Sequence, residues 1–274
     1  MSKNENLLTL QGITKIFSKG TVDEVVALED VSLDVHTEDY ITIIGSNGAG
    51  KTTLLNVIAG IFPPEEGQVI INGEDVTHLP EHKRARFFGR VHQDPKVGTG
   101  AKLTIEENLA FAWLRSKRRG LKTAINGKRR EIFRSALAPL GLGLEDRLNA
   151  FVGTLSSGQR QSIALTMATM SHPSVLLLDE HVANLDPRTA QIVFDITEMI
   201  VQREKLTTMM ITHNMECALK LGNRLIMMHR GKIIVDLGKE EKQKLTLNDL
   251  VKAFEQAAGE KLADESILLS RCEL

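Results

Sequence analysis

The residues with the clearest chemistry form a glycine-rich segment that follows a short apolar run. The segment matches the pattern G-x-x-x-x-G-K-[ST] in full and reads Gly45-Ser46-Asn47-Gly48-Ala49-Gly50-Lys51-Thr52-Thr53. Glycines let the backbone bend so that successive N–H groups converge on phosphate oxygens, and the helix expected next adds its positive N-terminal end. Lys51 supplies a point charge for the outer phosphates, and Thr52 offers a hydroxyl to a magnesium ion. The segment therefore predicts a phosphate-binding loop.

A second acidic site follows another apolar run, Val175 to Leu178, which is expected to be a strand. Asp179 stands at the end of this run and is the expected partner of the metal. Glu180 comes next, and it is the candidate general base because a carboxylate near the outermost phosphate can polarise an attacking water. An acidic pair alone is common on protein surfaces. The apolar strand before this pair and the phosphate-binding loop upstream make it specific.

Further motifs stand in a fixed order along the chain. They are Gln93 near the end of an expected strand, Leu155-Ser156-Ser157-Gly158-Gln159, Ala183-Asn184-Leu185-Asp186, and His213 after an apolar run. Together with the loop and the acidic pair, they resemble the Q-loop, signature, D-loop and switch histidine of the ATP-binding cassette ATPases. The resemblance extends from Phe17 to His213 and includes the hairpin expected beyond.

The resemblance implies ATP and Mg²⁺ as ligands, and an α/β fold. That fold is a P-loop NTPase (RecA-like) core with an antiparallel β part and an inserted α-helical subdomain. The implied catalytic residues are Lys51, Gln93, Glu180 and His213. The implied metal ligands are Thr52, Gln93 and Asp179. The implied nucleotide-binding residues are Phe17 as the adenine-stacking aromatic, the loop from Gly45 to Thr53, and Ser156, Gly158, Gln159 and Asp186.

The signature carries an implication about assembly. In the family it caps the γ-phosphate of ATP held by the opposite subunit, through the Ser156 hydroxyl, the Gly158 amide and the N-terminus of the helix that begins there. One copy cannot close on its own nucleotide. Because this chain holds one phosphate-binding loop and one signature, the simplest arrangement is a twofold homodimer that encloses two ATP molecules.

The elements that position these motifs alternate between short β-rich runs and helical stretches, which predicts an α/β domain. The expected strands are Ile41–Ile44, Val69–Ile71, Val91–Gln93, Ser174–Leu178, Thr208–Thr212 and Leu225–His229. A glycine at the turn Arg230-Gly231 predicts an antiparallel hairpin near the end of the chain, because such turns require a positive φ.

Helical patterns replace strands between about Gly98 and Leu155, beginning with a capping box from Thr104 to Glu107. The predicted domains are an α/β nucleotide-binding core at 1–97 and 163–240, a helical signature subdomain at 98–162, and a C-terminal helical extension at 241–274. In the extension, Leu247, Leu250, Val251 and Phe254 have helical spacing. The basic segment Arg115 to Arg130 is either a solvated surface or a contact for anionic lipid headgroups or an acidic partner.

Composition excludes several classes of protein. The 274 residues carry a net charge of -1, with 42% hydrophobic and 25% charged residues, which indicates a folded globular protein and no nucleic acid partner. The longest apolar run has six residues, whereas a membrane-spanning helix needs about 20. The start of the chain shows no pattern of a secretory signal, so a cytoplasmic location is expected.

These observations favour the ATP-hydrolysing subunit of an ABC transporter, peripheral on the inner face of the cell membrane. Its expected partners are a second copy of itself, permease subunits on separate chains and, indirectly, a solute-binding protein. Sequence similarity to bacterial import cassettes favours an amino acid or similar small solute. The alternative is a soluble ABC ATPase that acts as a scaffold or in repair. Two residues depart from the family's pattern, namely Ser157 in the signature and His181 after Glu180, where we expect a structural or tuning residue.

Overall fold

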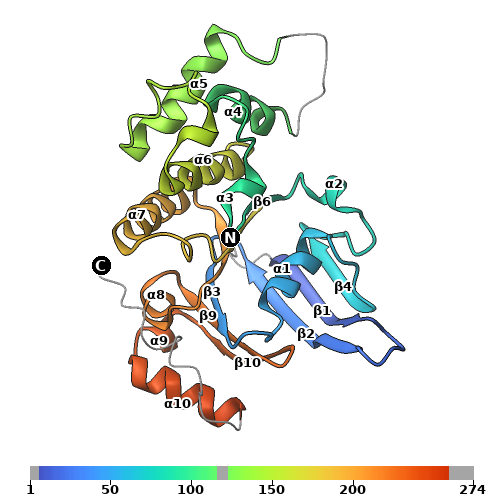
Figure 1. Ribbon diagram of the computed structural model, residues 1–274. Helices are drawn as coiled ribbons and strands as arrows, with labels where there is room; N and C mark the ends of the chain where they lie inside the picture. The colour runs from blue at the N-terminus through green and yellow to red at the C-terminus, as the bar shows by residue number, and fades with distance from the viewer. Residues whose placement is uncertain (1–5, 116–122, 259–274) are drawn as a thin grey trace, which may run out of the picture. The chain divides into compact units, whose positions relative to one another are not determined.

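The computed structural model describes residues 6–115 and 123–258, and the chain divides into two compact units (Figure 1). The first unit combines the residues up to Ala85 with those from Leu206 onward, and the second comprises Arg86–Lys205. Both units contain strands and helices. Two parts of the segments predicted from the sequence lie outside the described residues, namely 116–122 in the basic segment and 259–274 in the C-terminal extension.

An antiparallel sheet opens the first unit. Its strands are β1 (Asn6–Phe17), β2 (Val25–His36), β4 (Glu66–Ile71) and β5 (Glu74–Asp75), in the order β2-β1-β4-β5. Leu8 and Leu10 of β1 are buried on alternate positions, but the register shifts at Gly12, whose φ is 59°. Such a bulge changes which side chains face the core. Of these strands the sequence predicts only Val69–Ile71, because the bulge interrupts the alternation that would mark β1.

A second set of strands in the first unit contains the strand that precedes the phosphate-binding loop. These strands are β3 (Tyr40–Gly45), β8 (Thr207–Ile211), β9 (Arg224–His229) and β10 (Lys232–Leu237). β3 lies between β8 and β9 and is parallel to both, whereas β10 pairs antiparallel with β9. Every residue of β3 and β8 is buried, as expected of strands that are apolar on both faces.

The predicted hairpin near the end of the chain is confirmed by β9 and β10. Its turn residues, Arg230 and Gly231, both have positive φ values of 45° and 78°. That conformation suits a two-residue turn between right-twisted strands. The turn also contacts the phosphate-binding loop, because the Gly231 N–H donates to the Ala49 carbonyl at 3.1 Å.

The helices of the first unit are α1 (Lys51–Ala59), α2 (Glu81–Arg84), α8 (Met215–Lys220), α9 (Lys239–Lys242) and α10 (Leu247–Ala258). α10 confirms the helix predicted from the apolar spacing of the C-terminal extension. Its Leu250 and Phe254 are buried in a cluster with Ile44 of β3 and Met215 of α8. The cluster therefore connects α10 to the strand that leads into the phosphate-binding loop.

A buried arginine holds the far end of α1. Arg84 is 1% exposed, and its guanidinium donates to the carbonyl oxygens of Val57, Ile58, Thr77 and Leu79 at 2.6 to 3.0 Å. The carbonyls of the last helical turn have no partner within the helix, and a cation there is favoured by the helix dipole. Arg84 thus stabilises α1 at the end opposite the phosphate-binding loop.

The second unit begins with a pair of parallel strands, β6 (Phe88–Val91) and β7 (Val175–Asp179), in which Val91 lies opposite Leu178. β7 confirms the predicted strand Ser174–Leu178 to within a residue. The predicted strand Val91–Gln93 is wrong in its placement, since β6 ends at Val91. The pairing with β7 ends at Val91, and Asp94 caps a helix that starts with Pro95, so Gln93 lies in the connection between strand and helix.

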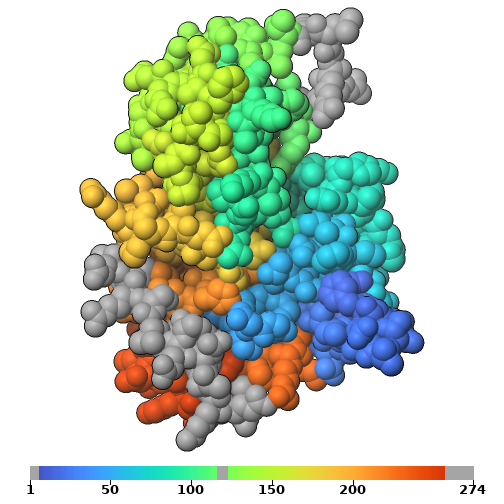
Figure 2. All heavy atoms as spheres, viewed as in Figure 1, coloured from blue at the N-terminus to red at the C-terminus, as the bar shows by residue number. Residues whose placement is uncertain are grey.

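The helices of the second unit are α3 (Pro95–Gly98), α4 (Ile105–Leu114), α5 (Gly127–Leu137), the short 3₁₀ helices η1 (Ala138–Leu140) and η2 (Val152–Thr154), α6 (Ser157–Thr169) and α7 (Pro187–Glu204). The predicted capping box is confirmed, because the Thr104 hydroxyl accepts from the Glu107 N–H and the Glu107 carboxylate accepts from the Thr104 N–H. On the face seen in the space-filling view, the residues of this unit, drawn in green to gold, lie against one another (Figure 2).

Candidate nucleotide site

The phosphate-binding loop joins the buried strand β3 to helix α1. Gly50 immediately before α1 has a φ of 96°, and a β-carbon there would come within 2.4 Å of the Ala27 carbonyl oxygen. Only glycine fits this position, because the backbone conformation is left-handed and the space is filled. Gly45 is restricted in the same way, because a β-carbon there would lie 2.2 Å from the Met228 carbonyl oxygen.

The lysine of the loop is held by the loop's own backbone. Lys51 is 6% exposed, and its ammonium donates to the carbonyl oxygens of Gly45 at 2.8 Å and Ser46 at 3.0 Å. Its positive charge thus lies inside the loop, next to the N-terminus of α1, where the helix dipole also favours an anion. Asn47 and Gly48 at the tip of the loop are exposed, as is the side chain of Thr52.

His213 emerges at the same edge of the sheet as the phosphate-binding loop. β3 and β8 run parallel with Ile43 opposite Ile211, and the Thr212 N–H donates to the Ile43 carbonyl at 3.1 Å. The carboxyl ends of adjacent parallel strands meet at one edge, which is where ligands bind in α/β sheets. The structure thus places His213 at the edge of the sheet from which the phosphate-binding loop begins.

Phe17 lies at the end of β1 and is supported by a second aromatic ring. The centroids of Phe17 and Phe62 are 5.2 Å apart with an interplanar angle of 86°, an edge-to-face arrangement. Phe62 follows closely after α1, since its N–H reaches the carbonyl of Asn56 in that helix. The sequence gives no sign of this contact, because the two phenylalanines are far apart along the chain.

Glu65 fixes the backbone beside Phe17. Its carboxylate accepts from the Lys15 ammonium at 2.7 Å and from the Ile16 N–H at 2.7 Å. Burial raises the pKa of Glu65, but the hydrogen bonds from Lys15 and Ile16 outweigh it, so the pKa lies below the usual value. The carboxylate remains charged at neutral pH and holds the end of β1 in place.

In the second unit, Asp179 and Gln93 leave the same edge of a parallel strand pair. Asp179 ends β7 and is 8% exposed, whereas Gln93 stands two residues beyond β6 and is exposed. Arg90 of β6 places Nη2 3.5 Å from Oδ2 of Asp179. Arg90 is a neighbour that sequence reasoning missed, although its position three residues before Gln93, on the strand that pairs with β7, could have indicated it.

The signature residues form the start of helix α6. The Ser156 hydroxyl accepts from the Gln159 N–H at 3.2 Å, and the Gln159 side chain accepts from the Ser156 N–H at 3.3 Å. This reciprocal pair is a capping box, which fixes the direction of the helix start. Ser156 and Ser157 are both exposed. The Ser157 side chain, which departs from the family's pattern, is therefore directed away from the packed interior.

Asp186 caps the start of helix α7 through its side chain. Its carboxylate accepts from the Thr189 N–H at 3.1 Å. Hydrogen bonds from the side chain and the backbone of Thr189 lower the pKa of Asp186. The charged carboxylate is therefore maintained at the positive end of a helix of 18 residues.

Comparison with known proteins decides the family. Residues 28–183 match the ABC transporter family. This chain belongs to that family. A tyrosine transport ATP-binding protein of Clostridioides difficile is 39% identical over 251 residues, which are 92% of this chain and 100% of the relative. A methionine import ATP-binding protein of Enterococcus faecalis is 33% identical over 96% of this chain and 74% of the relative.

Solved structures support the assignment of this chain to the ABC transporter family. A dimeric ATP-binding cassette in a post-hydrolysis state with ADP and phosphate has a TM-score of 0.72 and 26% identity, covering 85% of this chain and 98% of that one. A nucleotide-free cassette from an ABC transporter also has a TM-score of 0.72, with 27% identity over 89% of this chain and 96% of its own. The chain thus has the P-loop NTPase core of these cassettes and is an ATP-hydrolysing transporter subunit.

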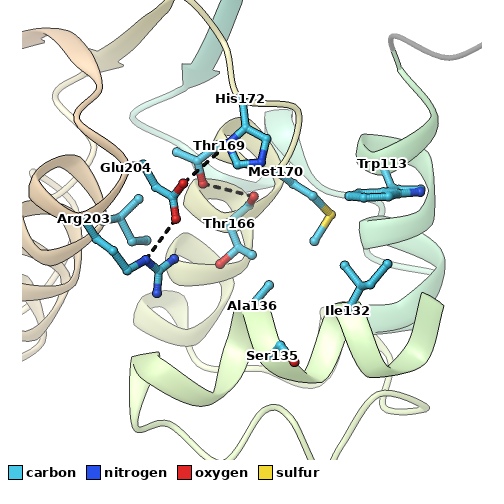
Figure 3. Close-up of a pocket in the computed structure, with 11 residues that line it drawn as sticks. Trp113, Ile132, Ser135, Ala136, Thr166, Thr169, Met170, His172, Arg203 and Glu204 are labelled. Atoms are coloured by element: carbon cyan, nitrogen blue, oxygen red, sulfur yellow. Dashed lines mark hydrogen bonds and ion pairs between the residues drawn. The ribbon is translucent and has the colours of Figure 1, made fainter. Parts of the chain in front are cut away.

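The part of this ABC subunit that the structure describes contains no helix long and apolar enough to cross a membrane. It does contain a cavity of about 210 Å³ among helices α4 to α7 (Figure 3). Trp113, Ile132 and Met170 line one side of the cavity, and on the other Glu204 lies 2.9 Å from Arg203 and 3.4 Å from His172. The cavity is lined by none of the predicted nucleotide-site residues.

His181 is the second departure from the pattern of ABC cassettes, and it is nearly inaccessible at 2% exposure. Burial lowers the pKa of its imidazole to about 4, so the ring is neutral at physiological pH. The ring meets Phe194 of α7 edge to face, with centroids 5.7 Å apart. Its burial and its packing against Phe194 give His181 a structural place rather than the open position of a metal ligand.

Proposed function

We propose that the chain binds Mg-ATP through the phosphate-binding loop and hydrolyses it as one half of a homodimer. The observation that carries the proposal is Lys51, whose ammonium is held inside the loop by the Gly45 and Ser46 carbonyls at the start of α1. In this position Lys51 places a positive charge against the outer phosphates, and the exposed loop residues offer their N–H groups. Phe17 stacks on adenine, supported by Phe62.

The donor set for a metal consists of the Thr52 hydroxyl, the Gln93 amide oxygen and the Asp179 carboxylate. These are hard oxygen ligands of the kind that Mg²⁺ prefers, and few protein ligands suffice because Mg²⁺ keeps several waters. A bound Mg²⁺ would neutralise charge that develops on the phosphate oxygens. The guanidinium of Arg90 lies beside Asp179 and places a positive charge of the protein near this carboxylate.

The water-activating group in this proposal is Glu180. Its carboxylate accepts a proton from the attacking water as the bond to the γ-phosphate forms, and the ADP oxygen leaves with the electrons of the broken bond. Gln93 orients the water, and His213 donates a hydrogen bond to the γ-phosphate. The position of His213 at the edge where the phosphate-binding loop begins supports its part in this scheme.

The second copy of the chain completes each nucleotide site. The exposed Ser156 hydroxyl, the Gly158 amide and the start of α6 cap the γ-phosphate of ATP bound by the partner, while Gln159 and Asp186 flank that contact. This is supported by the capping box at Ser156, which orders the start of a helix of 13 residues, and a helix N-terminus favours an anion. The solved structure of a related cassette in a post-hydrolysis state is dimeric.

Solute import through a separate permease is the transport task that we infer. Relatives named for tyrosine transport and methionine import support an amino acid or similar small solute. Exposed apolar side chains on the second unit, Val97 at 67%, Phe111 at 66% and Phe151 at 54%, fit a protein partner. The subunit then works on the inner face of the cell membrane, and a solute-binding protein delivers cargo to the permease.

Replacement of the proposed base tests this function. Glu180→Gln should bind ATP, accumulate dimers on size-exclusion chromatography and lose phosphate release. Glu131→Gln, which changes an exposed glutamate on α5, is the matched control and should keep wild-type turnover. Full hydrolysis by Glu180→Gln would refute the assignment of the base. Purification from membranes with a permease would support the transport role, and recovery of the chain without an integral partner would favour a soluble scaffold.

A further inference from the structure

A buried hydrogen bond ties the residue after Glu180 to the middle of helix α7. Nε2 of His181 lies 3.0 Å from the Thr197 hydroxyl oxygen. Both residues are almost inaccessible, at 2% and 0% exposure. The same imidazole packs edge to face against Phe194, one turn earlier on α7. His181 is thus attached to α7 by one polar contact and one aromatic contact.

The direction of this hydrogen bond follows from the other contact of Thr197. Its hydroxyl donates to the Val193 carbonyl at 2.7 Å, and a hydroxyl has only one hydrogen to give. The Thr197 oxygen must therefore accept from His181, which places the imidazole hydrogen on Nε2. An imidazole at this position satisfies the buried hydroxyl oxygen, whereas an apolar side chain would leave that oxygen with one partner fewer.

The backbone of Glu180 makes this attachment important. Glu180 has a φ of 48°, a left-handed conformation that costs energy for residues other than glycine and persists only when the surroundings enforce it. The Glu180 carbonyl accepts from the Ala183 N–H at 3.0 Å, which closes a tight turn. His181 lies inside this turn, and its side chain attaches the turn to the long helix α7.

Helix α7 also meets the signature. A β-carbon at Gly158 would come within 2.2 Å of Thr189 Cγ2 and 3.9 Å of Val193 Cγ2, so the start of α6 packs on the first turns of α7. Val193 in turn accepts the hydrogen bond of Thr197. Helix α7 therefore contacts the start of α6 through Thr189 and Val193, and it holds the turn of Glu180 through Thr197, four residues after Val193. The helices α6 and α7 lie side by side (Figure 1).

We propose that His181 and Thr197 are a pair of positioning residues that fix the Glu180 carboxylate relative to α7 and so link its alignment to the signature. This inference rests on the proposed function of Glu180 as the base. The pair does not touch nucleotide. Loss of the contact leaves ATP binding by the phosphate-binding loop intact and lowers the rate of the chemical step.

The test uses the full chain and three variants of the pair. Thr197→Val keeps the shape of the side chain and removes the acceptor. His181→Asn removes the donor at Nε2, because its amide nitrogen reaches only as far as Nδ1, whereas His181→Gln carries an amide nitrogen at the distance of Nε2. We expect Thr197→Val and His181→Asn to lower kcat about tenfold, which corresponds to about 1.4 kcal/mol, with an unchanged KM for ATP.

Rescue and coupling separate positioning from a general loss of stability. His181→Gln should restore most of the wild-type kcat, and the double variant His181→Asn with Thr197→Val should be no slower than either single variant. Thr166→Val is the matched control. Its hydroxyl donates to the Ser162 carbonyl at 2.8 Å within α6, so the change removes the same kind of bond without a histidine partner, and kcat should stay at the wild-type level.

The outcomes distinguish a failure of the positioning role of His181 and Thr197 from a failure of the proposed role of Glu180 as the base. Wild-type kcat in Thr197→Val, equal loss in Thr166→Val, or equal loss in His181→Gln and His181→Asn would overturn the positioning role. Each of these results leaves Glu180 as the base if Glu180→Gln has lost phosphate release. Retained hydrolysis in Glu180→Gln would instead refute the proposed function on which this inference rests.

Discussion

Gly158 of the signature lies directly against Thr189 of α7, with no room between them for even one carbon atom. A β-carbon added at Gly158 would sit 2.2 Å from Thr189 Cγ2, far inside van der Waals contact. The φ of this glycine is not positive, so the reason for glycine here is space. The Thr189 side chain of the helix capped by Asp186 thus occupies the space that a side chain at Gly158 would need.

Gly158→Ala should therefore separate the starts of α6 and α7. Overpacking of a filled site costs about 1 to 3 kcal/mol, and the displaced signature should cap the partner's ATP poorly. We expect ATP-dependent dimerisation to fail in the Glu180→Gln background, while nucleotide binding to the monomer remains. Size-exclusion chromatography with and without ATP measures this.

Gly127→Ala is the control for that variant. Gly127 begins α5 in the same unit, and a β-carbon there meets no atom within 4 Å. Its dimerisation should equal that of the parent. If Gly158→Ala also dimerises fully, the close packing has no part in the cap.

Lys51→Ala should abolish hydrolysis and weaken ATP binding. Charge-assisted hydrogen bonds are worth about 1.5 to 3 kcal/mol each, and Lys51 is expected to make more than one with the outer phosphates. Phosphate release and nucleotide titration measure the two effects. Lys128→Ala, at an exposed position of α5, should change neither. Near-normal turnover in purified Lys51→Ala would contradict the assignment of the loop.

The sequence predicts the core strands and the site motifs because both are encoded locally. Ile41–Ile44 and Val175–Leu178 are apolar on both faces, which marks covered parallel strands, and the spacing within Gly45–Thr53 describes a loop whose backbone does most of the binding. Both predictions depend only on neighbours along the chain. The structure places a strand at each of the two runs and a helix directly after the loop.

What the sequence does not reveal depends on contacts between distant segments. The bulge at Gly12 disguises β1, since a change of register has no unique signature in a single sequence. Phe62 reaches Phe17 only because α1 returns the chain to the end of β1. His181 stands out as a departure from the family's pattern, but its partner Thr197 becomes visible only when β7 and α7 are folded.

Phe62→Leu should raise the KM for ATP. The edge-to-face contact with Phe17 is worth about 0.5 to 1.5 kcal/mol, so a loosened adenine platform should raise KM about twofold to tenfold with little change in kcat. Steady-state phosphate release at varied ATP concentration measures both constants. Phe62→Tyr preserves the ring edge and should behave as the wild type. An unchanged KM in Phe62→Leu would show that Phe17 needs no support.

Because of Lys242, the stability of the folded protein should depend on pH in the alkaline range. Its side chain is 4% exposed and donates to the Thr42 hydroxyl and to the carbonyls of Leu221 and Gly222 at the end of α8. These partners are neutral. Burial lowers the pKa of Lys242 from 10.5 to about 8, because an ammonium ion loses hydration when it leaves water.

The sign of the effect follows from proton binding in the two states. Between pH 8 and 10.5 the unfolded chain holds a proton on Lys242 that the folded chain has released, so stability rises with pH across this window. Below pH 8 the Lys242 ammonium is charged in the folded protein, and the free energy of unfolding is reduced by the full cost of burying that charge. Wild-type stability relative to Lys242→Met should therefore increase by about 3 kcal/mol from pH 7.5 to pH 10.5.

Urea unfolding of both proteins at several pH values measures this difference, because lysines and tyrosines common to both cancel. Lys128→Met, at an exposed position, serves as control and should track the wild type at every pH. A wild-type advantage that shrinks as pH rises would mean that the ammonium form is favoured by its three acceptors. In that case Lys242 would stabilise the end of α8 as a cation, and the burial would not carry the cost assigned to it.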